Sequence, residues 1–154
     1  MGYGCAGYHG GMNCTIEWAG PDAASGMSFH AATGTGHWLS MDGAPEAGGR
    51  NLAPRPMEML LVGAGGCTAF DVVLILQRGR HAVSGCTVDL KAERAGTDPK
   101  VFTRIHLHFK LRGRQLPALA VERAIALSHE KYCSATAMLG RTAELTTSFE
   151  LLEA

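Results

Sequence analysis

The sequence predicts an α+β fold in which antiparallel sheets surround one long, buried central helix, in the order βββ-α-ββ-αα-β. Three patterns lead to this expectation. Apolar and polar residues alternate in two separate parts of the chain, as is typical of strands with one buried face. The segment 57–77 is apolar almost all round, as expected of a helix that is buried on every side. Two shorter helical segments and a last alternating segment complete the order.

The chain has 154 residues, enough for one domain with a hydrophobic core, and we expect this domain to span residues 12–154. Residues 1–11 read MGYGCAGYHGG, which is rich in glycine and poor in aliphatic side chains. Such a segment has little with which to build a core. We therefore expect residues 1–11 to be a disordered N-terminal extension and assign Cys5 no role.

The first strands are expected between Cys14 and Met41. Apolar residues alternate with polar ones in short runs separated by glycine, which indicates two or three short antiparallel strands. A loop rich in glycine and proline then runs to about Pro56 and separates these strands from the long helix.

The long helix at 57–77 contains three glycines between positions 63 and 66. Each costs about 1 kcal/mol of helix stability relative to alanine, so together they suggest that another backbone approaches closely. A short chain can hardly cover such a helix alone, and a homodimer with paired central helices would supply the missing cover. Asp71 inside the segment and Glu58 at its start disfavour a membrane span, where a carboxylate is costly.

The clearest hairpin joins residues 86–94 to residues 101–112. Acidic residues on the polar face of the first strand can oppose basic residues on the second, which favours antiparallel pairing. His106 and His108 share one strand face at a spacing that metal sites use, but no third ligand is evident near them. Pairing with Asp89 and its neighbours is the better account, so no metal site is predicted.

Pro117 is expected to begin an amphipathic helix. Its apolar stripe is predicted to consist of Leu116, Ala120, Ala124 and Leu127. A second short helix is expected to begin at Cys133 and to end near Gly140. A final strand over 142–151 completes the predicted order.

Composition disfavours two classes of partner. Lys and Arg together number 14, as do Asp and Glu, so the formal net charge is zero. A neutral domain has no electrostatic attraction to a phosphate backbone or an anionic membrane, so neither nucleic acid nor membrane is expected.

The five cysteines form no C-x-x-C pair, no signal peptide is visible and no cofactor is implied. We therefore expect a cytoplasmic protein in which a special cysteine is catalytic or redox-active.

Three stretches carry a resemblance to a known family: RPMEMLLVGAGGCTAFDVVLIL at 55–76, AERAGTDPKVFTRIHLHF at 92–109 and VERAIALSHEKYCSATAML at 121–139. They place GGC inside the long helix and a second cysteine at the start of a later helix. In these features the chain resembles the OsmC/Ohr family, and most closely its YhfA-like branch. The likeness covers nearly everything after Met12.

The resemblance implies an intertwined homodimer whose sites lie at the subunit interface. In catalytic members of the family, a thiolate on the central helix attacks an organic hydroperoxide. A second cysteine then resolves the sulfenic acid as an intrasubunit disulfide, and a dithiol such as reduced lipoyl protein restores the enzyme. Carried over to this chain, Cys67 is the attacking thiol and Cys133 is the resolving thiol.

Peroxide reduction requires a thiolate, and burial in an apolar helix raises a cysteine pKa, so a cation is expected to activate Cys67. Catalytic members use an arginine from the N-terminal strands, held by a glutamate near the start of the central helix, but residues 1–49 contain no Arg or Lys. Arg50 and Arg55 are the nearest substitutes. Glu58 precedes the thiol by nine residues, where catalytic members use ten. At about 100° per residue, this spacing puts Glu58 on roughly the opposite side of the helix from Cys67, where it could instead serve the site of the neighbouring subunit.

The remaining candidates have local alternatives. Asp71 lies on the same helix face as Cys67, where its carboxylate would raise the thiol pKa or would bind a backbone amide or a basic residue across the dimer. Cys133 is expected at a helix N-terminus, which favours a lowered pKa. Cys14 and Cys86 occupy strand positions that face a core, so we expect them to be small buried hydrophobes.

Two functions remain open from the sequence. The first is reduction of organic hydroperoxides in oxidative-stress defence, with Cys67 attacking, Cys133 resolving, and Arg50 or Arg55 assisting. The alternative is a non-peroxidatic relative that binds a small apolar ligand or another thiol at the dimer interface, as the absent arginine and the displaced Glu58 suggest. The surroundings of the attacking sulfur discriminate between these two functions.

Overall fold

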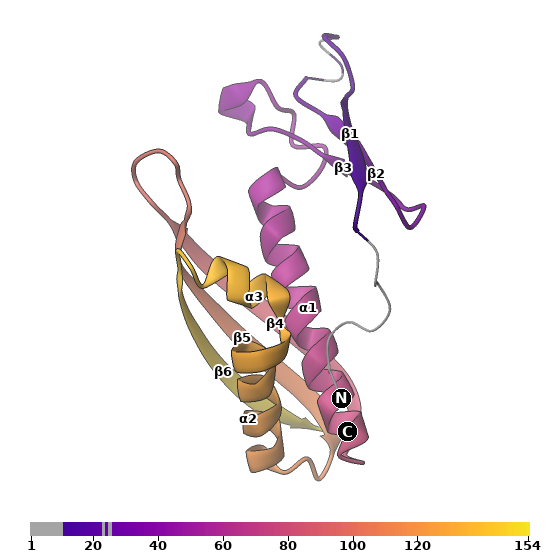
Figure 1. Cartoon of the computed structure of the whole chain (residues 1–154), viewed down its shortest axis with the longest axis vertical. Helices are drawn as coiled ribbons and strands as arrows, with labels where there is room; N and C mark the ends of the chain where they lie inside the picture. Colours follow the sequence, from indigo (N-terminus) through magenta and orange to yellow (C-terminus); the bar gives the residue numbers. More distant parts are fainter. Residues whose placement is uncertain (1–10, 23, 25) are drawn as a thin grey trace. The chain divides into compact units, whose positions relative to one another are not determined.

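The computed structural model describes residues 11–22, 24 and 26–154, so the predicted extension lies outside the described residues except for Gly11. The α+β class and the order βββ-α-ββ-αα-β are confirmed (Figure 1), and two additional short helices, η1 and η2, are present. The chain divides into two compact units, an N-terminal unit that ends at Val62 and a C-terminal unit from Gly63 to Ala154. The single domain expected over 12–154 stays a prediction.

The N-terminal unit contains a three-stranded antiparallel sheet in the order β1-β2-β3. The strands are β1 (Cys14–Trp18), β2 (Phe29–Thr33) and β3 (Trp38–Met41). They confirm the short antiparallel strands that the alternating pattern predicts. Few side chains of this sheet are buried. Every residue of β1 is exposed, whereas Ala31 of β2 is buried and only 4% exposed.

Asp42 organises the loop that follows β3. Its buried carboxylate accepts hydrogen bonds from the backbone N–H groups of Gly43 at 2.8 Å, Arg50 at 2.9 Å and Leu52 at 3.0 Å. These donors, that of Leu52 most strongly, favour the ionised carboxylate and lower the pKa of Asp42. The loop, which contains η1 (Pro45–Ala47), is therefore tied to the end of β3 by one side chain.

Helix α1 (Pro56–Arg78) confirms the long helix predicted for 57–77. At its start, the Glu58 carboxylate accepts a hydrogen bond of 2.9 Å from the Arg55 N–H, which satisfies a donor that the helix itself leaves unpaired. Among the described residues, α1 is the one helix long and apolar enough to cross a membrane. This is weak evidence, because the core helix of a soluble protein meets the same criterion.

Within a single chain, α1 is buried on one face. The buried residues recur at helical spacing and are Ala64, Gly65, Thr68, Asp71, Val72 and Leu76. A Cβ at Gly65 would lie 2.7 Å from Cδ1 of Leu90, so this glycine permits close contact with β4. A Cβ at Gly63 or Gly66 would meet nothing within 4 Å, and Phe70 is 51% exposed. A side chain, and not a backbone, thus approaches one of the three glycines within the chain. The expected backbone approach and the homodimer both stay predictions.

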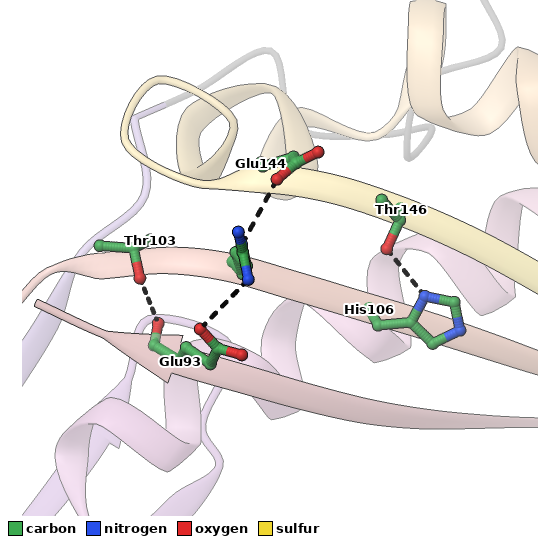
Figure 2. A network of polar contacts seen from close by, with 6 residues as sticks. Glu93, Thr103, His106, Glu144 and Thr146 are labelled. Atoms are coloured by element: carbon green, nitrogen blue, oxygen red, sulfur yellow. Dashed lines mark hydrogen bonds and ion pairs between the residues drawn. The ribbon is translucent and has the colours of Figure 1, made fainter.

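The C-terminal unit contains the sheet β4-β5-β6, whose strands are β4 (Ala82–Arg94), β5 (Phe102–Arg114) and β6 (Glu144–Glu153). The antiparallel pairing of β4 with β5 confirms the predicted hairpin. Opposite charges meet across it, as Nζ of Lys110 lies 2.9 Å from the Asp89 carboxylate. Figure 2 shows Glu93 and Glu144 on the two sides of β5, where Arg104 contacts their carboxylates at 3.8 Å and 3.5 Å.

Strand β6 pairs with β5 in parallel, so this sheet is mixed, whereas the sequence pattern predicts antiparallel sheets. The difference follows from the connection. Helices occupy the chain between β5 and β6, and a crossover of this kind returns a strand in the same direction as the one before it. Alternation alone predicts that a strand forms but not the direction in which it runs.

The paired histidines of β5 bind hydroxyl groups of β6. His106 Nδ1 lies 2.8 Å from Thr146 Oγ1 (Figure 2), and its Nε2 lies 2.8 Å from Ser148 Oγ. His108 lies 2.8 Å from the same Ser148 oxygen. Asp89 is opposite His108 in the strand register and interacts electrostatically with it, as predicted, whereas the hydrogen bonds of both histidines go to hydroxyl groups of β6. Strand β6, which pairs in parallel with β5, supplies hydroxyl partners for the two histidines that are not present in the β4–β5 hairpin.

Three helices connect β5 to β6: α2 (Ala118–Leu127), the π-helix η2 (Ser128–Tyr132) and α3 (Ser134–Leu139). Figure 1 shows α2 and the later part of α1 on the same face of the sheet. The core contains Val72 and Leu76 from α1, Ile105, Leu107, Phe109 and Leu111 from β5, and Val121 and Ile125 from α2. Burial of each large apolar side chain contributes about 1.5–3 kcal/mol. The stripe predicted for α2 is wrong at Leu127, which is 39% exposed.

Candidate functional site: two thiols and a buried carboxylate

Cys67, Asp71 and Cys133 converge within the C-terminal unit. Their two sulfurs and a carboxylate oxygen all lie within 4.8 Å of one another. Cys67 and Asp71 are four residues apart on α1 and share a face, as predicted. Cys133 comes from the start of α3. The structure therefore brings together the two cysteines that the resemblance paired.

An irregular turn positions Cys133. At the end of η2, the Cys133 N–H donates to the carbonyl of Ser128 at 2.8 Å, and Cys133 then adopts an extended conformation as the N-cap of α3. Its sulfur accepts a hydrogen bond of 3.5 Å from the Thr136 N–H, while Thr136 Oγ1 donates to its carbonyl at 3.1 Å. Cys133 is held by these bonds with 2% of its surface exposed.

Burial raises the pKa of the Cys133 thiol, so the prediction of a lowered pKa is wrong. The hydrogen bonds with Thr136 lower the pKa of Cys133, as predicted, but the loss of solvation on burial raises this pKa by more. The neighbouring Cys67 raises the pKa of Cys133 further. The sequence indicated the helix N-terminus correctly and could not indicate how deeply it is buried. Burial therefore disfavours the thiolate of Cys133.

Asp71 is 3% exposed and is bound by a hydroxyl. Ser128 Oγ donates to Asp71 Oδ2 at 3.1 Å, and Thr68 Oγ1 lies 2.9 Å from the same serine oxygen. Because Ser128 has one proton to donate, the Thr68 hydroxyl donates to it when Asp71 is ionised. Burial raises the pKa of Asp71 more than the bond from Ser128 lowers it. Within this chain the hydrogen-bond partner is a hydroxyl, and a backbone amide or a basic residue across the dimer stays a prediction.

Three polar residues of the site, Thr68, Ser128 and Thr136, were not predicted from the sequence. Thr68 carries a usable signal, because it follows Cys67 directly in an apolar helix, and a buried hydroxyl needs a partner. Thr136 stands three residues after the N-cap, where a backbone donor commonly meets the cap side chain. Ser128 has no comparable signal, because its place beside Asp71 depends on the π-turn of η2.

The predicted assisting residues Arg50, Arg55 and Glu58 belong to the N-terminal unit, where each has a local contact. Arg50 Nη1 donates to the carbonyl of Ala24 at 2.6 Å. The Arg55 N–H donates to the Glu58 carboxylate, so Glu58 acts as a cap for the start of α1. A role for these three residues in activating the thiol stays a prediction.

Two further cysteines differ in their surroundings. Cys14 is exposed, so the prediction that it faces a core is wrong, because neither face of β1 is covered. Cys86 is half-buried on β4, and burial raises the pKa of its thiol, as expected of a small hydrophobe. Cys86 lines a cavity of about 420 Å³. Apolar residues of α1 line the same cavity, namely Ala69, Phe70, Val73 and Leu74.

Comparison with known proteins gives the chain close relatives over most of its length. Residues 48–148 match the family described as OsmC-like protein, a range that includes both Cys67 and Cys133. Protein YhfA of Escherichia coli strain K12 is 44% identical over 143 residues, which cover 93% of this chain and 100% of that protein.

Solved structures share the fold. A hypothetical protein from Aquifex aeolicus VF5 is 28% identical, with a TM-score of 0.78 over 94% of this chain and 98% of that one. An organic hydroperoxide resistance protein from Elizabethkingia anophelis, with crystallant-derived thiocyanate bound, has a TM-score of 0.70 over 94% and 99% of the two chains. The identity to the second protein is 16%, so that likeness is one of fold alone.

Proposed function

This chain belongs to the OsmC-like protein family, and from that membership we propose that it reduces organic hydroperoxides, with Cys67 attacking and Cys133 resolving. The observation that carries the proposal is the convergence of the two sulfurs within 4.8 Å. A disulfide needs about 2.05 Å between its sulfurs, a gap that side-chain rotation can close. Cys67 is half-buried and within reach of a peroxide, whereas the buried Cys133 is sheltered, as a resolving thiol should be.

The proposed reaction has two chemical steps. The Cys67 thiolate attacks the terminal oxygen of the hydroperoxide, the O–O bond breaks, and the sulfur becomes a sulfenic acid. The alkoxide takes up the proton that the Cys67 thiol gave up and leaves as the alcohol. The Cys133 thiol then attacks that sulfur, water leaves, and a disulfide forms. A dithiol reductant in the cytoplasm returns both cysteines to thiols by exchange and is itself oxidised to a disulfide.

Asp71 is the proposed proton acceptor for Cys67. Burial raises the pKa of the Asp71 carboxyl and so brings it closer to that of a thiol. When the proton moves from sulfur to carboxylate, the site keeps a single negative charge, so no additional charge is buried. The carboxylate thus performs locally the activation that the resemblance assigns to a cation. In the homodimer that we also propose, Arg50 or Arg55 assists.

A second function is supported by different observations. The cavity of about 420 Å³ beside Phe70 and Cys86 falls within the usual size range of small-molecule sites, roughly 300–1,000 Å³. The raised pKa of Cys133 also slows any chemistry that needs its thiolate. A non-peroxidatic OsmC-like protein that binds a small apolar or thiol ligand is therefore the alternative.

Thiol counting after addition of cumene hydroperoxide tests the first function. The reduced chain has five cysteines, and we expect it to lose two free thiols, with a Cys67–Cys133 disulfide found by peptide mass mapping. Cys67→Ser should form no such disulfide, and Cys86→Ser, a matched change of another half-buried thiol, should behave as wild type. Equal thiol loss in wild type and Cys67→Ser rejects peroxide reduction at this site. No loss in wild type, together with saturable binding of cumyl alcohol, favours the second function.

A further inference from the structure

We infer that Cys67, Cys133 and Asp71 form a binding site for one thiophilic divalent cation, of which Zn²⁺ is the representative, with a fourth coordination position left open. The inference needs only the reduced site. It does not depend on hydroperoxide reduction, so either proposal can fail without the other. The sequence pattern predicted no metal, because the candidate ligands were the histidines of β5 and nothing in the sequence placed Cys133 beside Asp71.

The separation of the donor atoms fits such an ion. Two thiol sulfurs and a carboxylate oxygen lie within 4.8 Å of one another. Tetrahedral zinc has bonds of about 2.3 Å to sulfur and about 2.0–2.2 Å to oxygen, which place neighbouring ligand atoms roughly 3.5–3.8 Å apart. Small side-chain rotations of Cys67, Cys133 and Asp71 are therefore enough to complete the coordination, without movement of the backbone.

The three ligand side chains are also positioned by the fold before an ion binds. Cys67 and Asp71 project from adjacent turns of one helix, a spacing that places two ligands on the same side of an ion. Cys133 is fixed at the start of α3 by its hydrogen bonds with Thr136. Ser128 donates to Oδ2 of Asp71 and leaves the other carboxylate oxygen for the ion. A hydrogen-bond donor of this kind orients the metal ligand and strengthens its binding to the ion.

The donor set selects the kind of ion. Two thiolates favour soft or borderline cations and disfavour Mg²⁺ and Ca²⁺, which prefer oxygen ligands. The ion would neutralise two of the three negative charges that the ligands carry when all are ionised. Three protein ligands leave one position of a tetrahedral ion for water or a small ligand. Cys67 is half-buried, so this thiol is the side from which an ion can enter.

Thiol protection in the full reduced chain tests the site without any substitution. One equivalent of Zn²⁺ is added, N-ethylmaleimide follows, and peptide mass mapping gives the alkylation rate of each cysteine. We expect roughly tenfold or greater slowing at Cys67, because a metal-bound thiolate is not free to react. Cys14 and Cys86 should react at unchanged rates, and Mg²⁺ should protect no cysteine. Equal rates at Cys67 with and without Zn²⁺, or equal protection by Mg²⁺, overturn the inference.

Native mass spectrometry of matched variants identifies the ligands. Wild type and Cys86→Ser should retain one Zn²⁺ per chain, while Cys67→Ser and Cys133→Ser should lose it. Asp71→Asn should weaken binding, and Ser128→Ala should weaken it by about 10–100-fold through the loss of ligand orientation. One retained Zn²⁺ in both cysteine variants contradicts the assignment. Because the protection experiment uses the unaltered chain, a variant that fails to fold does not remove the test.

Discussion

The hydroxyl of Ser128 donates a hydrogen bond of 3.1 Å to Oδ2 of Asp71 within the C-terminal unit. The bond joins the centre of α1 to the first residue of η2, the turn from which Cys133 emerges. Both residues are buried, so neither has water as a substitute partner. Thr68 extends the contact, because its hydroxyl lies 2.9 Å from the serine oxygen. One polar contact in the core thus bears on stability and on the chemistry of the neighbouring thiols.

Removal of the Ser128 hydroxyl should destabilise the protein. Ser128→Ala leaves the buried Asp71 carboxyl without this donor, and an unsatisfied buried polar group costs about 1–3 kcal/mol. Urea unfolding followed by circular dichroism measures the loss. The control is Ser84→Ala on an exposed site of β4, which should change stability by less than about 0.5 kcal/mol. Equal stabilities for the two variants would contradict the assigned role of the bond.

The stability of the wild type relative to Asp71→Asn should fall as the pH rises. Burial raises the pKa of Asp71 above the value of 3.8 for an exposed carboxyl, so the folded state holds this proton more tightly than the unfolded state. The resulting stabilisation is fully present below pH 3.8 and is lost as the pH rises through the pKa in the folded state. The amide of the variant does not titrate. Urea unfolding of both proteins from about pH 4 upward gives the difference, and an increase with pH would show that the pKa is lowered instead.

Asp71→Asn should also slow the oxidation of Cys67 by cumene hydroperoxide. The amide cannot accept the thiol proton, and loss of a general base commonly reduces a rate by about 10²–10⁴-fold. The initial rate of thiol loss at neutral pH is the measurement. Asp89→Asn, which changes an exposed carboxylate on β4, is the control and should leave the rate unchanged. A faster reaction in Asp71→Asn would mean that the carboxylate acts only by repelling the thiolate.

Charge on the uncovered surface of α1 should disrupt the proposed homodimer. Phe70 is 51% exposed in the single chain, and a second copy packed over α1 would bury it. Phe70→Glu should therefore give a monomer, because the dimer would have to bury a carboxylate. Leu119→Glu changes an apolar side chain on α2 of similar exposure, 57%, and should remain dimeric. Light scattering during size-exclusion chromatography reports the masses. A monomeric wild type would end the dimer proposal.

Much of the fold could be predicted because its signals are local. Alternation along the chain predicted the hairpin of β4 with β5, and the apolar run at 57–77 predicted α1. Helical spacing alone placed Cys67 and Asp71 on one face. Each of these predictions depends on residues close together in the chain, whose geometry follows from the period of a helix or strand.

The sequence by itself determined the order of the helices and strands and singled out Cys67 and Cys133 as partners. Only the tertiary structure decided that Ser128 binds Asp71, that β6 runs parallel to β5, and that the pKa of Cys133 is raised. The physical reason is the same in each case. Solvation, strand direction and the partner of a buried hydroxyl depend on which distant segments pack together, and local periodicity does not contain that information. The helix N-terminus at Cys133 was predictable from sequence, whereas the desolvation that outweighs it arises only on folding.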